Sequence, residues 1–144
     1  MLRLARRDHA AFDALIAASG VPAAVALFHA QQAVEKALKS TMCLYGVTFR
    51  RTHDLEQLAS QLADAGHAAP VGEAELSRLT PYAVEYRYDD DAPELLSGEQ
   101  AKAIVESVMA WTAGHCGQFD SFMAERPMNQ PGSVLRDPFD DTAE

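Results

Sequence analysis

Apolar residues recur at three- and four-residue steps along most of the chain, and this spacing is typical of one face of a helix. The first such stretch covers about residues 2–18. It ends at "SGVP", where Gly20 suits a left-handed C-cap position and Pro22 suits the first turn of the next helix. The second stretch runs from about Pro22 to Tyr45, with Gly46 as its stop. The period-two alternation that predicts strands is not convincing anywhere in the sequence.

A short connector, "VTFRRT", leads to a third helical stretch that Thr52 or Asp54 can cap and that ends near Gly66. We place the start of this stretch near Lys39, on the assumption that it forms an antiparallel hairpin with the preceding helix. A shorter helix is expected at about residues 73–79.

Thr80-Pro81 breaks that helix and restarts it. Ser97 with Gln100 is a capping-box signature for the last helix. Its expected core-facing stripe comprises Ile104, Val108, Trp111, His115, Phe119 and Phe122. The sequence therefore predicts an all-α, antiparallel up-down bundle of four to five helices over residues 1–125.

Residues 126–144 lack this periodicity. They contain three prolines and four acidic residues. This composition predicts a disordered acidic tail, because it offers little apolar surface to offset the entropy of ordering.

Composition narrows the class of protein. The 144 residues are 48% hydrophobic and carry a net charge of −9, which disfavours a general nucleic-acid-binding protein. The charge is uneven, with a net of +4 over residues 1–51 and −13 over residues 52–144. The sequence lacks an apolar run of bilayer length and a secretory h-region, and Cys43 and Cys116 are too few for a disulfide framework. We therefore expect a cytoplasmic protein that does not insert into membranes.

The stretch "HAQQAVEKALKS" combines strong helix formers with regularly spaced polar residues. At 100° per residue, its polar side chains form one continuous ridge, with Glu35 at the edge of the core. Glu35 and Lys39 are an i, i+4 pair in the favourable order. The ridge is interpreted either as an ordinary solvated face or as a functional groove that comprises Gln32, Glu35, Lys36 and Lys39.

Three blocks of the chain carry a family resemblance: "FHAQQAVEKALKSTMCLYG", "RRTHDLEQLASQL" and "YAVEYRYDD". In this order they resemble the HEPN domain family (higher eukaryotes and prokaryotes nucleotide-binding domains), over about residues 5–124. The resemblance implies a helical bundle that forms a homodimer with a groove along the dimer face. It also implies one of several roles, which include ribonuclease toxins of toxin–antitoxin or defence systems and partners of a minimal nucleotidyltransferase.

The ribonuclease members of this family use an Arg-x(4–6)-His motif late in the chain. There, His can move the 2′-hydroxyl proton while Arg stabilises the phosphorane charge. In this sequence no His follows Arg78 or Arg87 in range, and the formal match from Arg3 to His9 lies at the opposite end. The enzymatic status therefore stays open.

Two further sets of residues are candidates for binding. Arg50, Arg51 and His53 bring positive charge to a helix N-terminus, which favours anions, although a simple cap also explains His53. Arg87 could project into the groove toward Glu35, or it could pair with the acidic residues around it. No metal-site spacing and no cofactor motif is found in the sequence, so neither a metal nor a cofactor is expected.

Three functions fit these observations. The first, which we favour, is a binding module for a nucleotide or a partner minimal nucleotidyltransferase. The second is a ribonuclease toxin that acts on RNA with a non-standard active site. The third is a structural dimeric scaffold.

Overall fold

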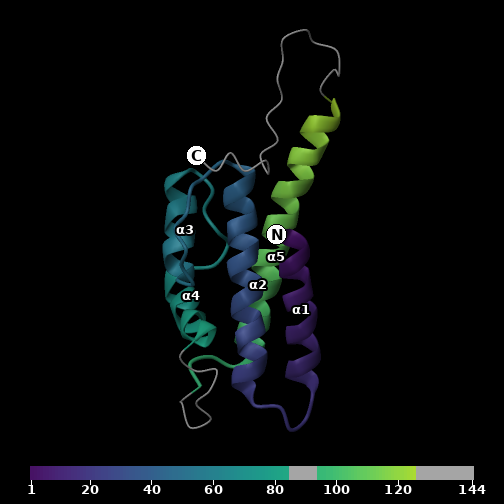
Figure 1. Cartoon of the computed structure of the whole chain (residues 1–144), viewed down its shortest axis with the longest axis vertical. Coiled ribbons are helices and arrows are strands. Elements are labelled where there is room, and N and C mark those ends of the chain that lie inside the picture. Colours follow the sequence, from purple (N-terminus) through teal and green to yellow (C-terminus); the bar gives the residue numbers. More distant parts are fainter. Residues whose placement is uncertain (85–93, 126–144) are drawn as a thin grey trace.

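The computed structural model describes residues 1–84 and 94–125. Their regular structure is helical and comprises α1 (Leu2–Ala17), α2 (Ala23–Leu44), α3 (Leu55–Asp64), α4 (Glu73–Leu79), a 3-10 turn (Thr80–Ala83) and α5 (Gly98–Glu125). The predicted all-α up-down bundle is confirmed (Figure 1). None of these helices combines the length and the apolar character that a membrane span requires. The predicted tail and Arg87 lie outside the described residues.

The helix ends follow from local signals in the sequence. Gly46 and Gly66 adopt φ angles of 67° and 91° after α2 and α3, a backbone region that glycine enters without steric cost. The predicted capping box at α5 is formed: the Ser97 N–H donates to Gln100 Oε1 (2.8 Å), and the Gln100 N–H donates to Ser97 Oγ (3.1 Å).

The start of α3 is capped twice. The Asp54 carboxylate accepts from the Gln57 N–H at 3.2 Å, as the sequence predicts. The Thr80 hydroxyl, which comes from the far end of α4, accepts from the Leu55 N–H at 3.1 Å. This second cap ties α3 to the 3-10 turn, so Thr80 joins two elements rather than only restarting a helix.

Helix α2 lies at the centre of the bundle. Thirteen of its 22 residues are buried, including the polar residues Gln31 and Glu35. Its four buried alanines on the core side let the neighbouring helices approach closely. A helix covered on so many sides is not a simple amphipathic helix with one solvated face.

The neighbours of α2 run in two directions. α1 precedes it as an antiparallel hairpin, whereas α5 runs in the same direction as α2 (Figure 1). The hydroxyls of Thr41 on α2 and Thr112 on α5 lie 3.1 Å apart in the core, and both lie within hydrogen-bonding distance of the Ala37 carbonyl. These bonds satisfy two buried hydroxyls between the two helices.

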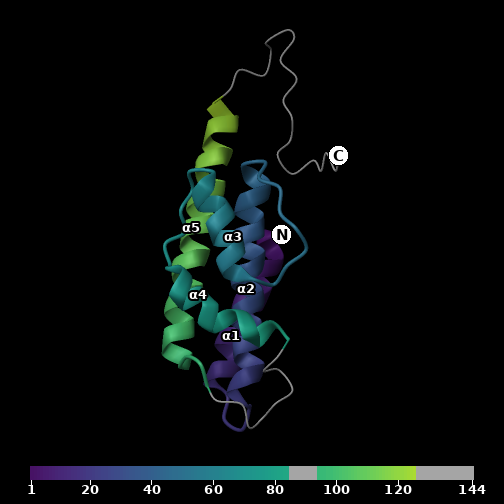
Figure 2. The same cartoon turned by 90° about the vertical axis from the view of Figure 1, so that its left-hand side faces the viewer.

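The connector between α2 and α3, residues 45–54, runs back along α2 (Figure 2). The Val47 N–H donates to the Met42 carbonyl, Phe49 lies under the Lys39 ammonium at 5.5 Å, and His53 reaches Glu35. α3 therefore starts beside the middle of α2 and runs parallel to it. The antiparallel α2–α3 hairpin that we expected is absent, because these contacts hold the connector along α2 rather than letting it turn over the helix end.

The expected stripe of α5 is only partly buried. Ile104 and Val108 lie in the core, but Trp111 is half-buried and Phe122 is 57% exposed. The last turns of α5 extend beyond the other helices in both views (Figures 1 and 2). His115, which we expected in the core, is therefore half-buried at the rim of the bundle, where its neighbours end.

Candidate functional site

The carboxylate of Glu35 is the centre of a polar network on α2. The Glu35 side chain is only 7% exposed, and both of its carboxylate oxygens have hydrogen-bond partners. Oε1 accepts from Gln31 Nε2 (3.2 Å) and His53 Nδ1 (2.7 Å), and Oε2 accepts from Lys39 Nζ (3.1 Å). Because a buried carboxylate is costly unless it is paired, these donors explain why Glu35 can occupy an interior position. The predicted i, i+4 pair of Glu35 and Lys39 is confirmed.

Gln31 is fully buried and uses both ends of its amide. Its Nε2 donates to Glu35 and to the His53 carbonyl (2.9 Å), and its Oε1 accepts from Gln32 Nε2 at 2.7 Å. The amide therefore links two turns of α2 to the backbone that precedes α3. Gln31 holds the start of α3 in place, and it is a residue of the network that the sequence interpretation missed.

The sequence contains a feature that could have identified Gln31 as a buried, hydrogen-bonded residue. At 100° per residue, its side chain lies about 40° from the centre of the apolar stripe of α2, whereas Gln32 lies on the polar ridge. A glutamine on the apolar side of a central helix requires internal partners.

His53 lies at the surface end of the network. A carboxylate only accepts hydrogen bonds, so Nδ1 of His53 carries the hydrogen that points to Glu35. The imidazole is 58% exposed, and in its neutral form Nε2 is left as an acceptor. An imidazole held by a carboxylate in this way can accept a proton from a bound molecule or, when protonated, contact an anion.

Lys36 belongs to a second network, between α1 and α2. Its ammonium pairs with Asp8 of α1, and the other Asp8 oxygen lies 3.0 Å from His29 Nδ1. The Asp8 side chain is 14% exposed and the Lys36 side chain is 28% exposed. Lys36 therefore joins α1 to α2, and its charge is compensated within the chain.

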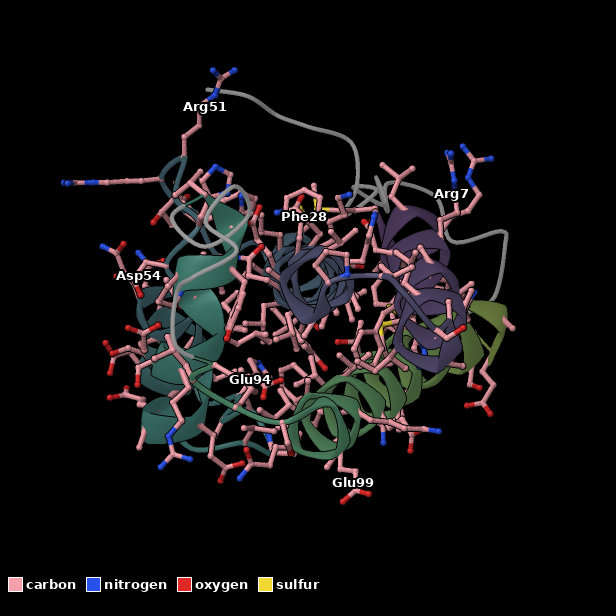
Figure 3. All side chains as sticks on the ribbon, turned by 90° about the horizontal axis from the view of Figure 1, so that it is seen from below. Arg7, Phe28, Arg51, Asp54, Glu94 and Glu99 are labelled. Carbon is pink, nitrogen blue, oxygen red and sulfur yellow. The ribbon has the colours of Figure 1, made fainter. Side chains whose placement is uncertain are left out.

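Arg50 and Arg51 lie on the connector just before His53, and both are exposed. Neither makes an ion pair with another residue of the described part of the chain. Figure 3 shows Arg51 extending away from the body, on the same side as Phe28 of α2 and Arg7 of α1, while Glu99 lies on the opposite side. This side therefore carries positive charge that is not neutralised by the carboxylates of the two networks.

The structure thus brings together Glu35, Lys39 and His53, with Gln32 attached through Gln31. It attaches Lys36 to α1 and leaves Arg50 and Arg51 exposed beside the network. A cavity of about 320 Å³ between α4 and α5 shares none of these residues and is lined by Glu75, Arg78, Leu96, Gln100 and Ile104. Within residues 1–84 and 94–125, no group of three or more His, Cys, Asp or Glu side chains is arranged to hold a metal ion.

One comparison with known proteins agrees with this architecture. Neither the curated proteins nor the solved structures give a match to the chain. The family model of the HEPN domain matches residues 1–115, which include α1 to α4, most of α5 and both polar networks. The chain belongs to the HEPN domain family.

Proposed function

We propose that this HEPN protein is a binding module whose ligand is a nucleotide or the acidic surface of a partner minimal nucleotidyltransferase. The proposed groove comprises Gln32, Glu35, Lys36, Lys39 and Arg87, and Arg50, Arg51 and His53 form its anion site. The observation that carries the proposal is the pairing of Glu35 with His53, since this bond fixes a connector that bears two exposed arginines beside α2.

The charges of the described residues support an anionic ligand. Lys36 faces Asp8, and Lys39 faces Glu35, so each of these lysines is matched by one carboxylate. Arg50 and Arg51 add two positive charges without a matching acid in the described part of the chain. Because Arg presents a planar fork of donors, a pair of exposed arginines suits phosphate or carboxylate groups.

The proposal predicts which substitutions weaken binding. The double variant Arg50→Gln/Arg51→Gln should bind a nucleotide or the partner at least about tenfold more weakly, since two charge-assisted contacts are lost. The matched control is Arg78→Gln/Lys102→Gln, which removes two charges from α4 and α5. Calorimetric titration with ATP, GTP and any nucleotidyltransferase encoded next to this gene measures the difference. Equal affinities of both double variants, or no binding by the unmodified protein, would refute the proposal.

The family context extends the proposal to assembly and location. We propose a two-fold homodimer that works in the cytoplasm, within a toxin–antitoxin or defence system. Light scattering at tens of micromolar protein tests the dimer directly, and a mass equal to one chain would exclude it.

A second function, cleavage of RNA with a non-standard active site, is favoured by one observation. Glu35 holds Nδ1 of His53 and leaves Nε2 at the surface, next to two arginines in the sequence. A positioned imidazole and a guanidinium are the groups that metal-independent RNA cleavage requires. We rank this function second, because the Arg-x(4–6)-His motif is absent from the second half of the chain.

A further inference from the structure

Four aromatic side chains meet where α2, α3 and α5 come together at one end of the bundle. Tyr45 follows α2, His67 lies in the loop after α3, and Trp111 and His115 are on α5. The Tyr45 and His67 rings stack at 3.6 Å with an interplanar angle of 12°. The Tyr45 hydroxyl lies 2.5 Å from His115 Nδ1, and the Trp111 ring meets the His115 ring edge-on at 4.8 Å. The proposed binding site uses none of these residues.

The position of His67 is fixed by the end of α3. The Gly66 N–H donates to the Ala63 carbonyl and the His67 N–H donates to the Leu62 carbonyl, at 2.9 Å each. With Gly66 at a φ of 91°, this is a Schellman motif that directs the chain away from the helix axis. The motif places His67 against Tyr45, so the loop of residues 66–72 starts with a contact to the end of α2.

The same loop has only modest apolar contacts. Ala69 and Val71 are partly buried against the core, whereas most other loop residues are exposed. The stacking of His67 in the aromatic cluster adds to these contacts in holding the loop to α2 and α5.

We propose that His115, with Tyr45 and His67, forms a proton-sensitive latch, which fastens the loop of residues 66–72 to the ends of α2 and α5 when the His115 imidazole is neutral and releases it when that imidazole is protonated. The ring centroids of the two histidines lie only 5.7 Å apart. Two imidazolium ions at this separation repel each other, and the half-buried site solvates them less well than open water does.

The Tyr45 hydroxyl does not abolish this sensitivity. It can donate to Nδ1 of a neutral His115, or accept from Nδ1–H of a protonated one. The hydrogen bond therefore survives in both states. What changes with protonation of His115 is the cost of burying its charge, and the charge of His67 adds to that cost.

The pKa of His115 changes in the direction that the latch requires. Burial lowers this pKa from its ordinary value of 6.5, and the nearby charge of His67 lowers it further. The closed loop thus binds protons less readily than the open loop. The stabilisation of the closed loop by neutral His115 is complete above the ordinary pKa of 6.5. It is lost as the pH falls below 6.5 toward the lowered pKa of His115.

Other titratable groups at this end of the bundle lie close to Cys116, which follows His115 in the sequence, and they shift the pKa of the Cys116 thiol. Burial raises the pKa of the Cys116 thiol, the hydrogen bond to Ser40 lowers it, Asp120 raises it, and Arg6 and the N-terminal amine of α1 lower it. Cys116 stays a thiol over the range in which histidine titrates. His67 is the charged group that acts on the pKa of His115.

The single tryptophan of the chain makes the latch measurable. A protonated imidazole quenches indole fluorescence on contact, so the emission of Trp111 reports the protonation of His115. His67→Phe keeps a ring against Tyr45 but cannot become charged. His115→Asn keeps a hydrogen-bonding group near the position of Nδ1, and His9→Asn on α1 is the control. The fluorescence midpoint should rise in His67→Phe, vanish in His115→Asn and stay unchanged in His9→Asn.

Hydrogen exchange of the His67 amide, which donates to the Leu62 carbonyl in the closed loop, then tests whether the loop opens. The rates, corrected for intrinsic chemistry, are compared at about pH 7.5 and about pH 5.5, on either side of the ordinary histidine pKa. The unmodified protein should lose protection by about tenfold for each unit by which the closed loop lowers the pKa of His115. His115→Asn should lose less than about twofold on the same comparison, whereas His67→Phe should lose an intermediate amount, because burial still lowers the pKa of His115 in that variant. Equal loss of protection in the unmodified protein and in His115→Asn, or no loss in the unmodified protein, would overturn the latch.

Discussion

Nδ1 of His53 lies 2.7 Å from Oε1 of Glu35, although the two residues are 18 positions apart in the sequence. One belongs to the connector and the other is buried in the central helix. Gln31 reinforces the contact, since its amide donates both to Glu35 and to the His53 carbonyl. The start of α3 is therefore attached to the middle of α2 by side-chain and backbone bonds at the same point.

Replacing the carboxylate should reveal how much the bundle depends on this attachment. We expect Glu35→Gln to lower the free energy of unfolding by about 2–3 kcal/mol, because Lys39 and His53 each lose a charged partner in a mostly buried site. Urea unfolding followed by circular dichroism measures the change. The control is Glu106→Gln on α5, whose pair with Lys102 is 3.9 Å long with both side chains more than half exposed. That control should cost less than about 0.5 kcal/mol, and a similar cost for both variants would contradict the prediction.

The contact between α1 and α2 should depend on Asp8 more than on either cation that it binds. Asp8→Asn weakens the bonds to both Lys36 and His29, so we expect a loss of about 1–2 kcal/mol in unfolding free energy. Asp13→Asn is the control on the same helix. The Asp13 side chain is 48% exposed, and it lies 3.4 Å from His9, one turn earlier on the same helix, so it does not join α1 to α2. The control should stay within about 0.5 kcal/mol of the unmodified protein. A control variant that is destabilised as much as Asp8→Asn would contradict this prediction.

Deletion of residues 127–144 tests the predicted tail. Their composition offers little apolar surface, so removing them should shift the melting temperature by less than about 2 °C. Differential scanning calorimetry of the truncated and full-length chains decides the matter. A fall of many degrees would mean that the tail contributes to the folded core.

The pure protein should not cleave RNA by the usual chemistry of its family, since the Arg-x(4–6)-His motif is missing from the second half of the sequence. Incubation with labelled single-stranded RNA in the presence of a chelator measures this. Cleavage that disappears in both His53→Ala and Arg87→Ala would contradict the prediction and favour the second proposed function. Cleavage that persists in both variants would indicate a contaminating nuclease.

The helix ends could be predicted from the sequence because their causes are local. Gly46 and Gly66 terminate helices within a residue or two of where the pattern of apolar positions stops, and the Ser97–Gln100 capping box involves only four consecutive residues. Each signal acts on the backbone beside it, so no knowledge of the tertiary structure is needed.

The site could be predicted only in part, because its contacts depend on the course of the connector. Helical spacing correctly paired Glu35 with Lys39, but it could not indicate that His53 would be their neighbour. That contact follows from the packing of Phe49 beside Lys39, which a one-dimensional pattern does not contain. For His115 the sequence pattern predicted more burial than the structure has. The stripe of apolar positions continues along α5, but the last turns of α5 extend beyond the neighbouring helices.

The return of the connector along α2 also bears on the order of folding. Its contacts with α2 join residues at most 22 positions apart, as between Gln31 and His53, whereas the hydroxyls of Thr41 and Thr112 join positions 71 apart. Closing a short loop costs less chain entropy than closing a long one, so short-range contacts form early. We hypothesise that α1, α2 and the connector form the nucleus and that α5 docks last. Substitutions at Phe49 should then slow folding, while substitutions at Val108 should mainly speed unfolding. Stopped-flow kinetics that place both residues in the same class would exclude this order.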